Sequence, residues 1–344
     1  MRSVSISVAA AVLLPLAACD MGTLRPAYGE ENSVIVLAAD SVWAAVGDSI
    51  QAALEPRVFT VRDEKTFEVT HASPFVEDWV NLRLFRQILA IGVPGDGWIE
   101  PLLDAHGESV DPPAVVEVGD VWARNQSVTA VIVPPGSDGN AVLPQLAEVA
   151  GMLDQRYRVY ARQRMFASGP DSALADSLRS ERGYTVLLPN VYQRERLPEA
   201  DVFRNHAEMG GVLLRTLYIG SRPEDVAEPT QALALEWRDS AATAYDPGQR
   251  VEGAGLQSRT IEVNGRAAFE TQGIWTSADA TWPAAGPFIS RIVPCPEQNR
   301  TYFLDAWLYA PGKSKYQYMI QLQTLLDSFR CGPGEAQAAA GSAD

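Results

Sequence analysis

The amino-acid sequence predicts an α+β fold in two lobes, a mixed α/β lobe followed by an antiparallel sheet covered by helices. In the first lobe, residues 33–168, short apolar strands alternate with amphipathic helices, an order typical of α/β proteins. In the second, residues 171–331, consecutive strand-like segments are separated only by short turns, which indicates antiparallel pairing. A chain of 344 residues with 47% hydrophobic residues is long enough for one large domain or two ordinary ones.

The first lobe should begin with a buried strand at residues 33–39 and a helix capped by Asp40 that continues to Leu54. Its remaining elements follow in order. They are short strands at 58–61 and 66–69, a helical turn at 74–79, strands at 87–93 and 127–133, and the longest helix, whose apolar stripe covers 142–160.

The second lobe should open with a helix at residues 171–182 that ends at Gly183 in a left-handed cap. Strands are expected at 184–188, 202–205 and 212–219, then a helix opened by Pro229, and then strands at 259–263, 267–275, 288–293 and 302–309. A final helix at 315–329 should cover the sheet with one apolar face, including Tyr318 and Leu322. The Ala/Gly-rich residues 332–344 are predicted to be a disordered tail.

The first eighteen residues have the features of a secretory signal peptide. Arg2 gives a positive start, and residues 8–18 form an apolar run that is too short to span a bilayer, which takes about 20 residues. The closing Leu16-Ala17-Ala18-Cys19 resembles the bacterial lipobox, in which a peptidase cuts before the cysteine and its thiol carries a diacylglycerol.

The lipobox resemblance implies a lipoprotein with lipidation at Cys19, where further acyl chains such as palmitate would make the tether permanent. Residues 19–32 would form a polar tether, and the protein would lie in the cell envelope, facing the periplasm or the exterior. Which membrane holds it stays open. The alternative is an ordinary secretory signal with a chance cysteine.

The net charge of the chain limits which macromolecules it can bind. The net charge of −15 repels nucleic acid, so no nucleic-acid partner is expected.

Cys295 and Cys331 remain after Cys19, and an oxidising compartment favours a disulfide between them over two free thiols. Three scattered histidines show no ligand spacing, so neither a metal site nor a cofactor is predicted.

Several short motifs, in order along most of the chain, resemble an uncharacterised family of bacterial lipoproteins known as domain of unknown function 4837. They are Trp43 with Val46-Gly47-Asp48-Ser49-Ile50, Arg86-Gln87-Ile88-Leu89, Trp122-Ala123-Arg124-Asn125-Gln126, Trp237-Arg238-Asp239 with Tyr245-Asp246-Pro247-Gly248, Gly273-Ile274-Trp275, Gly286-Pro287-Phe288 and Leu308-Tyr309-Ala310-Pro311. The family carries no assigned activity, so the resemblance implies a location in the cell envelope and a fold, and it implies no activity. The second lobe is also loosely similar to the PsbP and Mog1 type of α/β/α sandwich.

Three groups of residues are candidates for ligand binding. The first is a set of four arginines within nine positions, Arg156, Arg158, Arg162 and Arg164, which could grip a carboxylate or a phosphate or form a solvated, ion-paired helix face. The second is Arg238 with Asp239, which could present fixed groups or form a structural ion pair. The third is Trp282, beside Pro283, which could anchor a sugar or a partner.

No catalytic motif is recognisable. The sequence therefore favours a lipid-anchored binding or assembly module, without catalysis, that holds an envelope protein or a cell-wall component. The alternative is a hydrolase whose site assembles from distant residues such as Arg238, Asp239 and His206.

Overall fold

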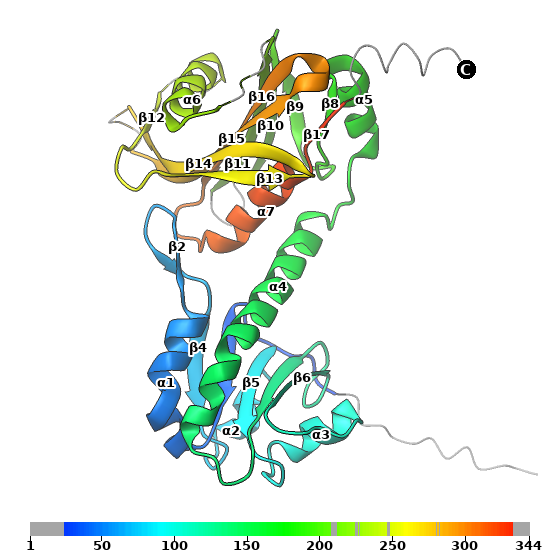
Figure 1. The fold of residues 1–344 in the computed structure, drawn as a ribbon, viewed down its shortest axis with the longest axis vertical. Helices are drawn as coiled ribbons and strands as arrows, with labels where there is room; N and C mark the ends of the chain where they lie inside the picture. The colour runs from blue at the N-terminus through cyan, green and yellow to red at the C-terminus, as the bar shows by residue number, and fades with distance from the viewer. Residues whose placement is uncertain are drawn as a thin grey trace, which may run out of the picture.

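Two β-sheets, one in each lobe, organise the computed structural model, which is shown in Figure 1. The structure describes residues 24–207, 212–223, 226, 228–245, 248–279, 281 and 283–332. The lipidation candidate Cys19, the candidate anchor Trp282 and the tail beyond residue 332 lie outside the described residues. Within them, no helix has both the length and the apolar character needed to cross a bilayer.

The sheet of the N-terminal lobe has the strand order β4-β1-β5-β7-β6. Its first four strands are parallel and the edge strand β6 is antiparallel. The strands are β1 (Ser33–Leu37), β4 (Glu68–Ala72), β5 (Gln87–Gly92), β6 (Ala114–Gly119) and β7 (Ser127–Ile132), and a separate hairpin is formed by β2 (Arg57–Val58) and β3 (Glu64–Lys65).

Helices cover both faces of this sheet because its central strands are apolar on both sides. Val34 and Val36 pack with α1 (Asp40–Leu54) and α4 (Leu146–Met165), whereas Ile35 and Leu37 pack with α2 (Trp79–Leu82) and α3 (Glu100–His106). A 3₁₀ helix, η1 (Gly139–Gln145), leads into α4.

Several sequence predictions in this lobe need correction. The strands expected at 58–61 and 66–69 are β2, Arg57–Val58, and β4, Glu68–Ala72. Asp40 is the first helical residue and Ala39 is the N-cap, without a side-chain cap. Helix α3, of seven residues, and strand β6, of six, were not predicted.

The sheet of the C-terminal lobe is antiparallel, with the order β12-β14-β15-β16-β11-β10-β9 and with β13 paired to β14. The predicted α+β fold is therefore confirmed. The strands are β9 (Gln193–Arg196), β10 (Ala200–Ala207), β11 (Leu213–Arg222), β12 (Gln249–Val251), β13 (Gln257–Val263), β14 (Arg266–Ser277), β15 (Ala285–Cys295) and β16 (Arg300–Tyr309). Strands β9 and β12 were not predicted, and the strand expected at 184–188 is only the two-residue β8 (Tyr184–Thr185), paired with β17 (Arg330–Cys331).

Helix α6 (Gln231–Tyr245) covers one face of this sheet, and α5 (Ser172–Arg182) and α7 (Tyr316–Asp327) cover the other. The limits of α5 follow from its caps. The Asp171 side chain accepts a hydrogen bond from the Leu174 N–H at 2.9 Å, and Gly183 ends the helix with φ of 72°, which favours glycine.

Helix α7 packs into both lobes. Its Leu322 and Leu325 belong to the core of the C-terminal lobe, whereas Tyr316 and Ile320 complete the core of the N-terminal lobe. The Tyr316 ring stacks on the ring of Tyr157 in α4, with centroids 5.6 Å apart. The two lobes therefore share a helix, and α4 connects them in Figure 1.

The described part of the predicted tether lies against the N-terminal lobe. The Ala27 N–H donates to the Arg124 carbonyl at 2.8 Å, and the Tyr28 hydroxyl donates to the Asn81 carbonyl at 2.8 Å. Residues 24–28 thus run along the end of α2 and the loop before β7.

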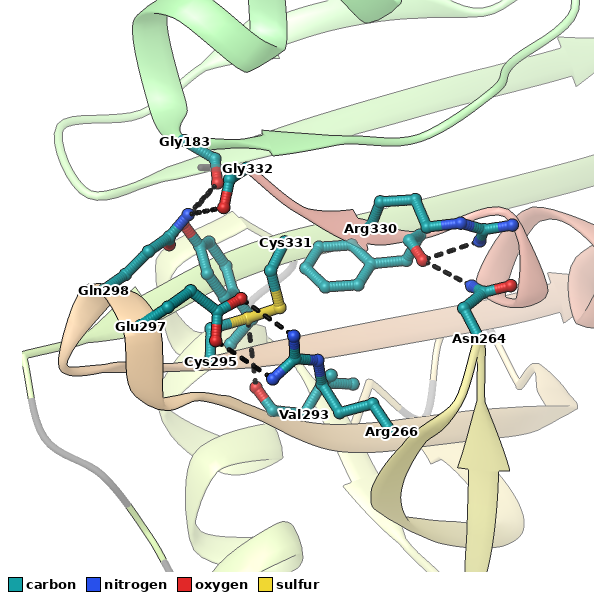
Figure 2. The surroundings of a disulfide bond; sticks show 12 residues. Gly183, Asn264, Arg266, Val293, Cys295, Glu297, Gln298, Arg330, Cys331 and Gly332 are labelled. Atoms are coloured by element: carbon teal, nitrogen blue, oxygen red, sulfur yellow. Dashed lines mark hydrogen bonds and ion pairs between the residues drawn. A yellow bond between two sulfur atoms is a disulfide. The ribbon is translucent and has the colours of Figure 1, made fainter. Parts of the chain in front are cut away.

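Cys295 and Cys331, the pair that the sequence favours, are joined by a disulfide with their Cα atoms 6.0 Å apart (Figure 2). The bond connects the end of β15 to β17. Around it, the Gln298 amide donates to the carbonyls of Gly183 at 2.6 Å and Gly332 at 2.9 Å. Glu297 lies close to the two sulfur atoms, but both thiols are used in the disulfide, so this group does not form a metal site.

Candidate functional site: a cavity in the C-terminal lobe

A cavity of about 650 Å³ lies between α5 and the ends of β10, β11 and β16. This volume falls in the range of small-molecule sites, roughly 300–1,000 Å³. The charged and hydroxyl-bearing residues in its wall are Asp176, Arg179, Ser180, Glu181, Arg182, Tyr184, Glu199, Asp201, Ser221, Arg300 and Tyr302.

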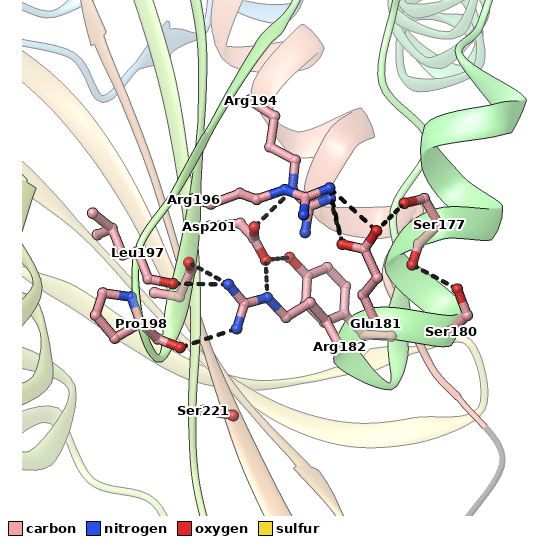
Figure 3. A network of polar contacts seen from close by, with 12 residues as sticks. Ser177, Ser180, Glu181, Arg182, Arg194, Arg196, Leu197, Pro198, Asp201 and Ser221 are labelled. Carbon is pink, nitrogen blue, oxygen red and sulfur yellow. Dashed lines mark hydrogen bonds and ion pairs between the residues drawn. The ribbon is translucent and has the colours of Figure 1, made fainter.

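Asp201 anchors the wall of the cavity (Figure 3). Asp201 lies at the start of β10. Its side chain is fully buried and faces Arg182 at the end of α5. One carboxylate oxygen accepts from Arg194 Nε at 2.7 Å, and the other accepts from the Tyr184 hydroxyl at 2.9 Å and faces Arg182 Nε at 3.1 Å. A buried carboxylate needs such partners to remain ionised.

The same network holds Arg182 in place. Its two terminal nitrogens donate to the carbonyls of Pro198 at 3.1 Å and Leu197 at 2.8 Å. The guanidinium is therefore committed to protein atoms and shapes the wall. Glu181 closes the network by pairing with Arg194 at 2.9 Å.

Arg300 differs from Arg182 and Arg194 in its partner. Arg300 is half-buried in the wall, and its Nη1 donates to the Ser221 hydroxyl at 3.0 Å. Within the part of the chain that the structure describes, no carboxylate lies within ion-pair distance of Arg300. Arg179 lines the same wall and is more than half exposed, with Asp176 3.8 Å away. A cation without a carboxylate partner in a concave site is suited to an acidic ligand.

The cavity continues into a smaller one of about 120 Å³, because Glu199, Gly220 and Ser221 line both. The wall of the extension is aromatic, with Trp237 and Phe303 among its residues. The Arg222 guanidinium lies 4.3 Å from the centroid of the Trp237 ring, a cation–π contact that fixes the ring. The site thus has one end where Arg179 and Arg300 lie and another end with aromatic rings and Arg222, with the exposed Glu199 lining both.

The two tyrosine hydroxyls in the wall of the larger cavity are poor nucleophiles. Burial, and then the adjacent Asp201 carboxylate, raise the pKa of Tyr184 well above its usual value. Burial also raises the pKa of Tyr302 to about 12, and its hydroxyl lies 2.8 Å from Gln298 Oε1. Both tyrosines therefore stay protonated at neutral pH and act as hydrogen-bond donors. The described wall contains no histidine.

The structure separates the four candidate arginines of α4. Arg156 donates to the Gln87 side chain at 2.6 Å and pairs with Glu117. Arg158 pairs with Asp154 at 2.7 Å and donates to the Tyr316 hydroxyl at 3.3 Å. These two arginines join α4 to the sheet of the N-terminal lobe and to α7, respectively.

The other two arginines of this group are exposed. Arg164 donates to the Tyr160 hydroxyl one turn earlier, at 2.7 Å, whereas Arg162 makes no side-chain hydrogen bond or ion pair within the described residues. The four guanidiniums do not converge on one ligand, and none of them lines the cavity of the C-terminal lobe.

Arg238 and Asp239 point to different sides of α6. Arg238 is 1% exposed, pairs with Asp305 at 3.2 Å and donates to Gln249 at 2.8 Å. Asp239 is exposed. The ion-pair alternative holds for Arg238, although its partner is Asp305 on β16 and not Asp239, so the two residues do not form a joint ligand site.

His206, named with them for the hydrolase alternative, lies on β10 with Nε2 3.2 Å from the Thr216 hydroxyl. It is not in the wall of the cavity. The three residues of that alternative therefore do not meet in the cavity.

Sequence reasoning missed the residues that build this cavity. Arg182, Asp201, Ser221 and Arg300 come from four separate elements, so no local spacing marks them. The one available signal was the unusual pairing of Asp201 with apolar neighbours, in the run Ala200-Asp201-Val202-Phe203, since a charged residue inside a buried strand needs a partner.

Comparison with known families confirms the predicted resemblance over the C-terminal lobe. Residues 175–328 match the family described as "Domain of unknown function (DUF4837)". A search of curated proteins gave no match.

Two solved structures are similar to part of the chain. The Ran-binding protein Mog1p of Saccharomyces cerevisiae has 12% identity, a TM-score of 0.30, and coverage of 43% of this chain and 90% of its own. The cyanobacterial PsbP (CyanoP) of Synechocystis sp. PCC 6803 has 13% identity, a TM-score of 0.31, and coverage of 43% of this chain and 86% of its own.

Proposed function

We propose that this protein is a lipid-anchored envelope protein that binds a small acidic ligand in the cavity of its C-terminal lobe, without catalysis. The observation that carries the proposal is Arg300, a half-buried cation in a concave wall that is paired with a hydroxyl instead of a carboxylate. The lipobox residues ending at Cys19 support the anchor.

The groups in the two parts of the cavity limit the class of ligand that can bind. An acidic group would lie against Arg300 and Arg179, and an apolar group would reach Trp237 in the extension. Glu199, at the junction, has no ion pair within the described residues and would accept from an ammonium or hydroxyl of the ligand. A short peptide with a free carboxylate, such as a fragment of a cell-wall component, has this combination of groups.

The absence of catalysis is inferred from the state of the polar groups. Asp201 is held by two arginines and a tyrosine, so both of its oxygens are already bound to protein groups. Tyr184 and Tyr302 keep their protons because their pKa values are raised. In the described wall the Ser221 hydroxyl is bound to Arg300, and no histidine lies beside it to act as a base. We therefore infer that the site positions a ligand and does not transform it.

The test is a thermal-unfolding titration of the purified protein with dialanine, which carries a carboxylate and an ammonium, and with acetate, which carries only a carboxylate. We expect dialanine to raise the melting temperature with saturation. Arg300→Gln should shift the midpoint of both titrations to higher probe concentration, since losing a charged hydrogen bond weakens binding by about 1.5–3 kcal/mol, or roughly ten-fold to a hundred-fold. Glu199→Gln should remove the advantage of dialanine over acetate.

The matched control is Arg162→Gln, the same substitution at an exposed arginine outside the cavity, which should leave both responses unchanged. An unaltered dialanine response in Arg300→Gln would exclude the cavity as the binding site. Turnover of ester or peptide substrates by the wild-type protein would exclude the non-catalytic assignment.

The anchor is tested separately by mass spectrometry of the N-terminal peptide from membrane-purified protein. We expect Cys19 to be the first residue and to carry diacylglycerol. A chain that retains its first eighteen residues, or an unmodified Cys19, would contradict the anchor. Crosslinking in intact cells would then identify the envelope partner or wall component held by the anchored protein.

A further inference from the structure

An exposed apolar surface lies beside α2 in the N-terminal lobe. Phe75 is 73% exposed, Val76 48% and Val80 55%. The half-buried Trp98 supports this surface, since the rings of Phe75 and Trp98 make an edge contact with their centroids 5.4 Å apart. Single exposed apolar residues are common on proteins, but several together mark a contact surface.

The beginning of the described chain adds to this surface. Leu24 is 40% exposed and Tyr28 43%. The Tyr28 ring contacts Phe85, with centroids 4.6 Å apart, and its hydroxyl donates to the carbonyl of Asn81, the residue after Val80. Five of the exposed large apolar side chains of the described residues lie on residues 24–28 and 75–80. The two segments meet where Tyr28 bonds to Asn81, while Phe75 lies farther along, beside Trp98. We call these two segments together the α2 surface.

The chain length between the lipid and this surface is short. Leu24 follows Cys19 by five positions, and an extended chain spans at most about 3.3–3.6 Å per residue. An acylated Cys19 thus holds Leu24 within about 17 Å of the lipid attachment point. The side of the lobe that carries Leu24 would therefore lie near the bilayer.

The charged residues on the α2 surface do not by themselves determine whether it binds anionic lipid. Arg25 and Arg124 are exposed and adjacent, since the Arg124 N–H donates to the Arg25 carbonyl at 2.8 Å, and they suit anionic headgroups. Glu77 and Asp78, also exposed, oppose them. Insertion of apolar and aromatic side chains into the interface is therefore the main contribution, as in proteins that rest on a membrane.

We propose that the α2 surface rests on the lipid bilayer when Cys19 is acylated, an inference that depends on the anchoring part of the proposed function. Phe75, Val76 and Val80 enter the interfacial region, with Leu24 and Tyr28 beside them. Helix α4 rises about 30 Å over its 20 residues and connects this lobe to the C-terminal lobe (Figure 1). The C-terminal lobe is thereby held at the end of the molecule away from the anchor.

The test places the photocrosslinking residue benzoylphenylalanine at position 75 of the full-length, lipidated protein in vesicles of phosphatidylethanolamine and phosphatidylglycerol. The control position is Val191, which is 50% exposed and lies in the C-terminal lobe. We expect position 75 to crosslink to lipid at least ten-fold more than position 191. Equal crosslinking at the two positions would overturn the proposal.

A second measurement separates this inference from the anchor. Mass spectrometry of the same preparation reports whether Cys19 carries lipid. A lipidated Cys19 without lipid crosslinks at position 75 overturns the α2 surface alone, whereas an unmodified Cys19 overturns the anchor as well. Crosslinking of position 75 to a protein in intact cells, in place of lipid, would also overturn the bilayer as the occupant.

Discussion

Tyr316 connects the lobes, and its truncation should destabilise the whole protein. The side chain is 7% exposed, its ring stacks on Tyr157, and its hydroxyl contacts Asp154 and accepts from Arg158 at 3.3 Å. Removing a buried aromatic side chain costs about 3–5 kcal/mol. Tyr316→Ala should therefore lower the free energy of unfolding by about 3–4 kcal/mol.

Tyr316→Phe keeps the ring and removes only the hydroxyl. Asp154 and Arg158 still pair with each other at 2.7 Å, so we expect a loss of about 1 kcal/mol. Tyr318→Phe is the control, because the Tyr318 hydroxyl makes no hydrogen bond within the described residues. Urea unfolding followed by tryptophan fluorescence measures all three variants. A Tyr316→Ala protein within 1 kcal/mol of the wild type would refute the role given to α7.

Three further substitutions test buried parts of the C-terminal lobe. Arg238→Met leaves Asp305 buried without its charged partner and should cost about 3–5 kcal/mol, measured by urea unfolding; a neutral effect would contradict the ion pair. Replacing Cys295 and Cys331 by serine opens a loop with a sequence separation of 36 and should cost about 4 kcal/mol, which a reducing agent should reproduce in the wild type. Burial acts to raise the pKa of Glu270, but its arginine contacts and hydrogen bonds outweigh burial and lower it. The stabilisation from the ionised form is thus present above the unfolded pKa and is lost as the pH falls through the folded pKa. Glu270→Gln should therefore cost stability at pH 7 and progressively less as the pH falls through the folded pKa, and a cost independent of pH would contradict the assignment.

The parts of the fold that the sequence predicts well are those fixed by local chemistry. Helix α5 begins at a side-chain cap from Asp171 and ends at Gly183 because both signals are contained in one short segment. Strand β5 agrees with its prediction to within one residue, since six consecutive buried positions follow a clear apolar run. In these cases tertiary packing selects the same structure as the local sequence.

The missed elements lack such signals. Strand β9, Gln193–Arg196, contains no apolar residue and exists because it pairs with the edge of β10. Helix α3 is only seven residues long. Both are determined by neighbours that lie elsewhere in the chain, and periodicity within a short window cannot report them.

The candidate site shows the same limit. Arg238 stands out in the sequence beside Asp239, yet its partner Asp305 is 67 positions away, and only the packing of α6 on the sheet buries it. Arg300 has no distinctive neighbours in the sequence and becomes a candidate because Ser221, on the adjacent strand β11, brings it to the cavity. Polarity is visible in a sequence, whereas burial and convergence are properties of the fold.

The shared helix also limits how the family match can be interpreted. The matched segment, residues 175–328, contains α7 but ends before Cys331. Cut out of the chain, it would expose Tyr316 and Ile320, which are buried here by the N-terminal lobe, and it would lose the disulfide. Exposing two large apolar side chains costs about 1.5–3 kcal/mol each, a substantial part of the usual stability of a domain, which is about 5–15 kcal/mol. In this chain the cavity therefore belongs to a lobe whose stability depends on the lobe that carries the α2 surface.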